Sequence, residues 1–384
     1  MKRRLIRKIQ ALAAVLAFVM LAALYAKYAA PPKTQTALSV FREGTPLSVD
    51  TIDGLSNRAS GIVLYDALTD TVLYEKGGDL RLPMASTTKI MTAVVALENG
   101  RLDEMYTVPP EVCGIEGSSI YLRAGEVLSL RELLYGLLLE SGNDAAEAIA
   151  LCVGTTREGF IGMMNEKAAQ LGLSSTHFDN PHGLSSETHY TTAKELAALT
   201  AYAMRSDFFR EAVACKYYGI AEREHCAARY FSNHNRLLRT FPLCVGVKTG
   251  YTAASGRCLV TAAEQNGGRF IAVTLNDRLD FADHKILLQY AADSYRTICF
   301  ADAGTLLYRA APRTLIRNAL FAKNAAPLYL TVPKEYDAPL SVKVTVRKSA
   351  LLRGEQNAAC AEIRMGEYAM RRELCAASGA EKGA

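Results

Sequence analysis

The chain of 384 residues lacks two patterns that would each have set a direction: it contains no C-x-x-C pair and no G-x-S-x-G segment. Without the second pattern an esterase of the α/β-hydrolase type is excluded, because its nucleophilic serine lies in that turn. The nine cysteines are odd in number and scattered. We therefore expect mostly free thiols, with one or two disulfides as the alternative, rather than the disulfide framework of a small domain.

Excess charge is also missing from the body of the chain. The formal net charge is +5, but residues 1–30 hold six basic side chains and no acidic one. The remaining residues carry 38 basic and 39 acidic side chains, a net charge of −1. A body with nearly balanced charge gives no indication of nucleic-acid binding, and we predict no nucleic-acid partner.

The N-terminal segment is typical of an export signal. Basic residues cluster between Lys2 and Lys8, and an entirely apolar run follows from Ala11 to Ala26. That run is shorter than the roughly 20 residues that a membrane-spanning helix needs. We expect residues 1–30 to be a cleaved signal peptide or a retained N-terminal anchor. Both interpretations place the body outside the cytoplasm, with membrane attachment only if this segment is uncleaved.

The first part of the body alternates between short strands and a helix. Residues 31–50 are polar and contain prolines, which indicates a linker. The β-prone runs 61–66 and 71–75 flank a tight polar turn and predict a hairpin. A helix is expected from Ser86 to Leu97, closed by Asn99-Gly100.

The middle of the chain is mostly helical. Helices are expected over Leu128–Leu139, Asp144–Cys152, Gly159–Leu171, Thr192–Met204 and Phe281–Ile298. Thr192 and Glu195 have the spacing of a capping box. Strands are expected over 257–263 and 269–275, because Gln265-Asn-Gly-Gly268 between them is a strong hairpin signal. This order predicts an α/β (α+β) body with a helical insertion.

The pattern changes after about residue 303. Residues 327–332 and 340–346 alternate polar and apolar side chains, as half-buried strands do. We therefore predict a catalytic domain over 51–303 and a small β-rich domain over 304–384.

Three short motifs appear in a fixed order: Ser86-Thr-Thr-Lys89, Ser141-Gly-Asn143 and Lys248-Thr-Gly250. On a helix, Ser86 and Lys89 share one face, so the lysine amine reaches the serine hydroxyl. A lysine can remove the serine proton if burial and a nearby cation lower its pKa, and Lys248 could supply that cation. Ser86 at a helix start would also find free backbone N–H groups for a developing oxyanion.

The second motif lies in a turn between two expected helices. There Ser141 would pass a proton to the departing amine. Asn143 would hold the substrate amide and Lys89. Either residue alone would be unremarkable in a turn, so this assignment depends on the order of all three motifs.

The third motif lies in a β-prone stretch, where a strand edge could pair with an extended peptide. Gly250 would permit close approach of that peptide. Lys248 and Thr249 would then face its terminal carboxylate. The backbone N–H of Tyr251 would complete the oxyanion site that begins at Ser86.

The motif set resembles that of the D-alanyl-D-alanine carboxypeptidases, the low-molecular-mass penicillin-binding proteins. The similarity extends from about residue 55 to 300. It is carried by Tyr65–Lys76, Pro83–Thr92, Phe178–Leu184, His189–Ala193 and Lys248–Thr252. The resemblance implies the fold of the serine β-lactamases and penicillin-binding transpeptidases, in which an antiparallel sheet is flanked by helices beside a helical lobe.

The resemblance also implies a function. Ser86 would be acylated by peptidoglycan stem peptides that end in D-Ala-D-Ala, the last D-alanine would leave, and water would release the shortened peptide. β-Lactams would acylate the same serine as covalent inhibitors. No metal and no organic cofactor is implied.

Three alternatives remain open. A D-Ala endopeptidase would carry the same motifs. A weak β-lactamase would need a carboxylate that activates water, and the segment His177–Gly183 offers only Asp179 at the expected distance along the chain. A non-catalytic wall-binding protein would have lost Ser86 or Lys89, and both are present.

Overall fold

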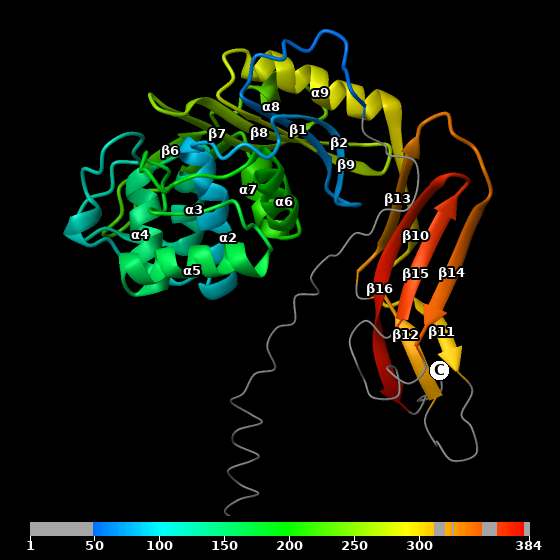
Figure 1. The fold of residues 1–384 in the computed structure, drawn as a ribbon. Helices are drawn as coiled ribbons and strands as arrows, with labels where there is room; N and C mark the ends of the chain where they lie inside the picture. The colour runs from blue at the N-terminus through cyan, green and yellow to red at the C-terminus, as the bar shows by residue number, and fades with distance from the viewer. Residues whose placement is uncertain (1–48, 311–318, 325, 348–358, 380–384) are drawn as a thin grey trace, which may run out of the picture. The chain divides into compact units, whose positions relative to one another are not determined.

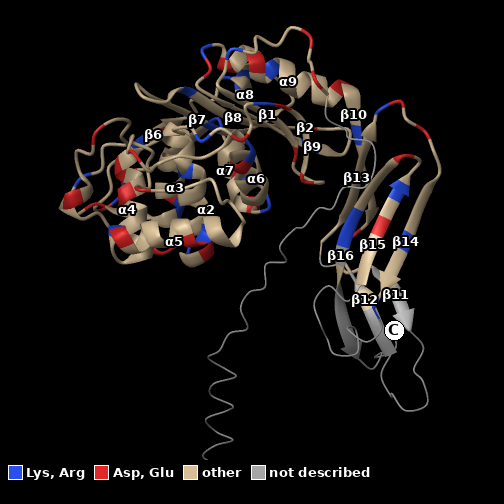
Figure 2. Cartoon of the chain, viewed as in Figure 1, with Lys and Arg blue, Asp and Glu red and all other residues tan. Residues whose placement is uncertain are grey.

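The computed structural model describes residues 49–310, 319–324, 326–347 and 359–379. The predicted signal or anchor segment, 1–30, and nearly all of the predicted linker, 31–50, lie outside these residues. In the described part of the chain, no helix has the length and apolar character needed to cross a membrane. Basic and acidic side chains are interspersed along its helices and strands (Figure 2), in keeping with the balanced charge of the body.

A five-stranded antiparallel sheet organises the catalytic part, with the strand order β2-β1-β9-β8-β7 (Figure 1). Its strands are β1 (Gly61–Asp66), β2 (Thr71–Lys76), β7 (Cys244–Thr252), β8 (Gly256–Gln265) and β9 (Gly268–Leu275). Both predicted hairpins are confirmed, β1 with β2 and β8 with β9. Asn266 and Gly267 take positive φ values of 53° and 75°, as a tight two-residue turn requires. Strand β7 is left at one edge of the sheet.

Both faces of the sheet are covered, and β1 shows how the sequence achieves this. All six of its residues are buried. Because successive side chains of a strand point to opposite faces, Ile62 and Leu64 pack in the cluster with helix α9 (Asp280–Ser294). Val63 belongs to the larger cluster formed with the helical lobe. Figure 1 shows α9 on one side of the sheet and helices α2 to α7 on the other.

The helical lobe is formed by one short 3₁₀ turn and a series of α-helices. They are η1 (Ala85–Thr88), α2 (Lys89–Asn99), α3 (Leu130–Leu139), α4 (Asn143–Gly154), α5 (Arg157–Gln170), α6 (Ala193–Ala203) and α7 (Asp207–Ala214). Shorter elements connect them: β3 (Met105–Thr107), η2 (Pro110–Val112), β4 (Val127–Ser129), β5 (Tyr217–Ile220), β6 (Arg229–Ser232) and α8 (Leu237–Thr240). The expected helices before residue 205 are thus present, with shifted ends.

The capping box predicted at the start of α6 forms only in part. The Thr192 hydroxyl accepts the N–H of Glu195 as expected. The Glu195 carboxylate, however, accepts hydrogen bonds from Ser175 N (2.9 Å) and Thr176 Oγ1 (2.5 Å), so it ties a neighbouring loop to the helix. A tertiary contact has replaced the local one.

The helix predicted over Phe281–Ile298 ends earlier than expected. Helix α9 ends at Ser294, and Tyr295–Ala301 form strand β10, which pairs with β13 (Leu328–Pro333). The aromatic and β-branched side chains of Tyr295, Thr297 and Ile298 are compatible with a strand, and pairing with β13 stabilises that conformation.

A second five-stranded sheet follows, with the order β11-β12-β16-β15-β14. Its strands are β11 (Leu306–Ala310), β12 (Ala319–Lys323), β14 (Leu340–Val346), β15 (Ala359–Met365) and β16 (Tyr368–Gly379). Strands β13 and β14 were predicted, whereas β15 and β16 were not. In β15, residues 359, 361, 363 and 365 are buried and the residues between them are not, the alternation of a half-buried strand.

Candidate active site

Ser86 lies in the 3₁₀ turn η1, immediately before the buried helix α2. Ala85 before it has a φ of 46°, a left-handed conformation that is costly for a residue other than glycine. The turn is fixed by the Thr88 hydroxyl, which donates to Ala85 O (2.8 Å). The strained turn therefore presents the Ser86 hydroxyl at the junction of sheet and helical lobe, although it is a 3₁₀ turn and not the regular helix start that we predicted.

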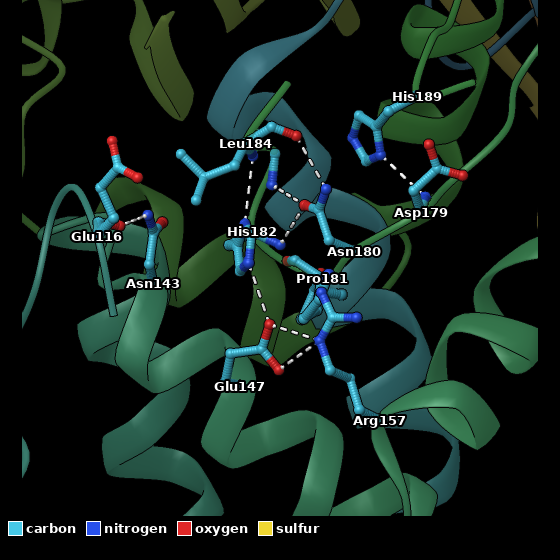
Figure 3. Close-up of polar contacts among 12 residues, drawn as sticks. Glu116, Asn143, Glu147, Arg157, Asp179, Asn180, Pro181, His182, Leu184 and His189 are labelled. Carbon is cyan, nitrogen blue, oxygen red and sulfur yellow. Dashed lines mark hydrogen bonds and ion pairs between the residues drawn. The ribbon is translucent and has the colours of Figure 1, made fainter. Parts of the chain in front are cut away.

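His189 contacts this turn through Thr88, and Figure 3 shows its ring beside Asp179. Its Nδ1 accepts the N–H of Asp179 (3.0 Å), so the ring proton is on Nε2, which lies 2.7 Å from Thr88 Oγ1. Burial lowers the pKa of His189 to about 4, so the ring is neutral at physiological pH. His189 therefore connects the loop at Asp179 to the turn η1 through one hydrogen bond on each ring nitrogen.

Lys89 is fully buried and is the centre of the polar cluster. Its Nζ lies 2.9 Å from Ser86 Oγ, 2.7 Å from Asn143 Oδ1 and 2.6 Å from the backbone oxygen of His182. A neutral amine has two N–H groups and one lone pair. Because Asn143 Oδ1 and His182 O are both pure acceptors, they take the two N–H groups, and the lone pair is directed at the Ser86 hydroxyl.

The charge state of Lys89 suits this geometry. Burial lowers the pKa of Lys89 well below its ordinary value, and the nearby charge of Lys248 lowers it further. The buried carboxylate of Asp144 acts in the opposite direction. The balance of these effects makes Lys89 more readily deprotonated than an ordinary lysine, as a general base requires.

Asn143 and Asp144 open helix α4 and fix the loop that leads into it. Asn143 Nδ2 donates to Glu116 O (2.5 Å), which holds the amide so that its oxygen faces Lys89. The Asp144 carboxylate accepts the N–H groups of Ile120 and Leu122, each at 3.0 Å. Asp144 was not predicted as a site residue; its position directly after the Ser-Gly-Asn motif was the available signal.

Ser141 is buried in the turn before α4, with a φ of 63°. Its Oγ has no hydrogen-bond partner among the described residues. A buried hydroxyl without a partner costs about 1–3 kcal/mol, so this group is available to a bound molecule. The structure thus places Ser141 two residues from Asn143, but it makes no direct bond with Ser86 or Lys89 there.

Lys248 is fully buried on the edge strand β7 and donates to Thr249 O (2.9 Å). Burial lowers its pKa to about 7, and the carboxylate of Glu140 opposes this shift. Within the described chain, Lys248 forms no hydrogen bond with Ser86, Lys89 or Asn143, and its influence on Lys89 is through charge.

The residues after Lys248 line the outer edge of the sheet. A Cβ atom at Gly250 would lie 3.0 Å from the backbone nitrogen of Ser86, so β7 passes directly against the turn that carries the serine. Thr249 is half-buried, and Tyr251 is exposed. The edge position of β7 leaves this side free of any described strand, as the sequence predicted.

One group at the site has no counterpart in the predicted set: the backbone carbonyl of His182. It accepts a hydrogen bond from Lys89, and Ser86 Oγ lies 3.4 Å from it. A backbone oxygen has no sequence signature of its own; the Pro-His-Gly turn was the only signal for this position.

An antiparallel sheet covered by helices, with a serine and a lysine paired at the start of a buried helix, defines the class of serine enzymes that react with penicillin. The family model for D-alanyl-D-alanine carboxypeptidase matches residues 49–279, more than half of the chain. This chain therefore belongs to the D-alanyl-D-alanine carboxypeptidase family of serine peptidases.

Individual relatives agree with this assignment. The chain is 36% identical over 228 residues to the D-alanyl-D-alanine carboxypeptidase DacF of Bacillus subtilis, a match that covers 57% of each protein. It is similar to a Streptomyces DD-transpeptidase (TM-score 0.57, 33% identity, covering 60% of this chain and 96% of that one). It is also similar to the D-alanyl-D-alanine carboxypeptidase DacD of Francisella tularensis (TM-score 0.62, 27% identity, 86% and 96% covered).

Proposed function

We propose that the chain is a serine D-Ala-D-Ala carboxypeptidase that removes the terminal D-alanine from peptidoglycan stem peptides through an acyl-enzyme on Ser86. The observation that carries this proposal is the hydrogen bonding of Lys89. Its Nζ lies within hydrogen-bond distance of Asn143 Oδ1, His182 O and Ser86 Oγ (2.9 Å to the last); when the amine is neutral, the first two accept its N–H groups and its lone pair is left for the Ser86 hydroxyl. That arrangement prepares Ser86 for attack on a carbonyl carbon.

In the acylation step, Ser86 Oγ bonds to the carbonyl carbon of the penultimate D-alanine as Lys89 takes the hydroxyl proton. The negative oxygen would be stabilised by the N–H groups of Ser86 and Tyr251. The bond to the terminal D-alanine then breaks, and its nitrogen must gain a proton. Ser141, whose buried hydroxyl is available, would pass that proton from Lys89 to the leaving amine. Water then cleaves the ester and restores Ser86.

Substrate orientation would depend on strand β7. The stem peptide would add to its free edge as an extended strand, and Gly250 lets β7 lie directly against the turn that carries Ser86. Lys248 and Thr249 would receive the terminal carboxylate. We place this chemistry outside the cytoplasm, where peptidoglycan lies, after export directed by residues 1–30.

Release of D-alanine from diacetyl-Lys-D-Ala-D-Ala tests the proposed reaction. We expect one D-alanine per peptide, measured by amino-acid analysis. A cross-linked muropeptide dimer cut faster than this peptide would favour an endopeptidase. Rapid multiple turnover of penicillin would favour a β-lactamase. Thr188 Oγ1 lies 2.9 and 2.8 Å from the two oxygens of the Asp179 carboxylate and donates its single proton to it, which argues against a free water-activating base there.

The role of Lys248 predicts a specific pH dependence. Burial lowers its pKa to about 7, so the ammonium is present below pH 7 and is lost as the pH rises through that value. The advantage of a free-acid peptide over its C-terminal amide should therefore be greatest below pH 7. Measured as the ratio of the two kcat/KM values, it should fall about tenfold per pH unit well above pH 7. A ratio that stays flat from pH 5.5 to 9 contradicts this role.

The variant Glu140→Gln tests whether the Glu140 carboxylate raises the pKa of Lys248. Glu140 is the carboxylate that raises the pKa of Lys248, and it accepts the N–H of Ser232 (2.6 Å). Glu140→Gln keeps an acceptor for Ser232 but removes the charge. The fall in the ratio should then occur at a lower pH. An unchanged or higher midpoint would show that Glu140 does not set the charge state of Lys248.

A further inference from the structure

A polar cluster of buried Glu147 and His182 with partly exposed Arg157 lies beside the turn whose carbonyl accepts from Lys89; Figure 3 shows these three side chains. Glu147 Oε1 is 3.0 Å from His182 Nε2, and Arg157 Nε donates to both Glu147 oxygens at 3.0 and 3.1 Å. The side chains of Glu147 and His182 are 8% and 6% exposed. A carboxylate at such depth is unusual unless its partners are fixed.

The hydrogen bonds of His182 determine which ring nitrogen is protonated. Its Nδ1 accepts the N–H of Leu184 (3.2 Å), so the proton must be on Nε2, where it is donated to Glu147. Burial lowers the pKa of His182 although Glu147 opposes the shift, so the ring is neutral. The ring therefore bridges its own turn and helix α4 with one acceptor and one donor.

The same turn is fixed on its other side. Asn180 Oδ1 accepts the N–H of Gly183 (2.6 Å), and Thr92 Oγ1 on α2 donates to Pro181 O (2.5 Å). Gly183 has a φ of 95°, and a Cβ there would lie 1.9 Å from Ala85 O. The turn is thus packed against the strained residue before the nucleophile, and a small displacement of it would be felt at Ser86 and Lys89.

Helix α4 reaches Lys89 by two routes. Asn143 and Glu147 are four residues apart and so lie on one face of the helix. Asn143 accepts one N–H of Lys89 directly (2.7 Å). Glu147 holds His182, whose backbone oxygen accepts another (2.6 Å).

We propose that Glu147 is a positioning residue that, through the His182 ring, fixes the His182 carbonyl on Lys89 and so directs the Lys89 lone pair at Ser86. The inference rests on the proposed function of Ser86 and Lys89. It assigns the effect to the acceptor that Glu147 provides for His182 and not to its ion pair with Arg157.

Two matched double variants separate these contributions. Glu147→Met with Arg157→Met removes both the ion pair and the acceptor, and it leaves no unpaired buried charge. Glu147→Gln with Arg157→Met also removes the ion pair but keeps a carbonyl oxygen for His182 Nε2–H. For each full-length protein, the dependence of labelling rate on fluorescent penicillin concentration gives the acylation rate constant and the dissociation constant of the non-covalent complex.

We expect the Met/Met variant to acylate about 10- to 100-fold more slowly than the wild type, because small misalignment of reacting groups is costly. Its dissociation constant should stay within about threefold. The Gln/Met variant should acylate within about threefold of the wild type. Equal rates in the two variants would overturn the inference, whether both are slow or both are fast. A wild type that is not acylated at all would instead contradict the proposed function.

Discussion

Replacement of Ser86 by alanine should abolish covalent labelling by fluorescent penicillin and reduce D-alanine release on the order of 10⁶-fold. The Ser86 hydroxyl is the group that Lys89 faces at 2.9 Å, and alanine leaves no atom to form the ester. The substitution removes one half-buried hydroxyl whose described partners are Lys89 and His182, so the fold should be retained. Labelling is read by gel fluorescence.

The control for this variant is Ser60→Ala. Ser60 accepts a hydrogen bond from Asn276 on the surface, and its loss should change neither labelling nor D-alanine release. Thermal melting of both variants separates loss of chemistry from loss of folding. If a folded Ser86→Ala protein is still labelled by penicillin, Ser86 is not the nucleophile.

Replacement of Lys89 by methionine should slow acylation by about 10²- to 10⁴-fold, the usual contribution of a general base. Methionine fills a similar volume without an amine, so no group remains to take the Ser86 proton. Non-covalent penicillin binding should change much less than the acylation rate. Time courses of labelling over a range of penicillin concentrations give both quantities.

Lys167→Met is the matched control, because it removes another buried lysine. Lys167 Nζ lies 2.5 Å from the carboxylate of Glu98. Glu98 is on helix α2, nine residues after Lys89. That separation corresponds to about 13 Å along helix α2. This variant should lose stability without loss of the acylation rate constant. Equal slowing in the two variants would mean that losing any buried lysine impairs acylation, and that Lys89 has no specific role as the base.

The fold could be predicted from sequence where local signals agreed with tertiary structure. The hairpins β1–β2 and β8–β9 were visible because turn residues separate β-prone runs. The end of α9 was missed because the apolar spacing continues past Ser294, and only pairing with β13 turns Tyr295–Ala301 into a strand. Strands β15 and β16 were missed because these segments, which contain charged residues, acquire a buried face only within the second sheet.

Some of the active-site residues could likewise be predicted from the sequence, and others could not. The order of the motifs was enough to propose that Ser86, Lys89 and Asn143 act together, and the structure joins these three by hydrogen bonds. The His182 carbonyl and the Glu147 carboxylate could not be found, because their roles arise from chain segments that are distant in sequence. A backbone oxygen belongs to every residue, and a glutamate within a helix is ordinarily a solvated side chain.

The central claim is that Ser86 is the acylated atom, and peptide mapping of the penicillin adduct tests it most directly. Trypsin should release residues 82–89, because Arg81 and Lys89 are cleavage points. Wild-type protein treated with penicillin should carry one penicilloyl group per chain, located by fragment-ion mass spectrometry on Ser86. An adduct on Ser141, or on any residue outside the 82–89 peptide, would contradict the account.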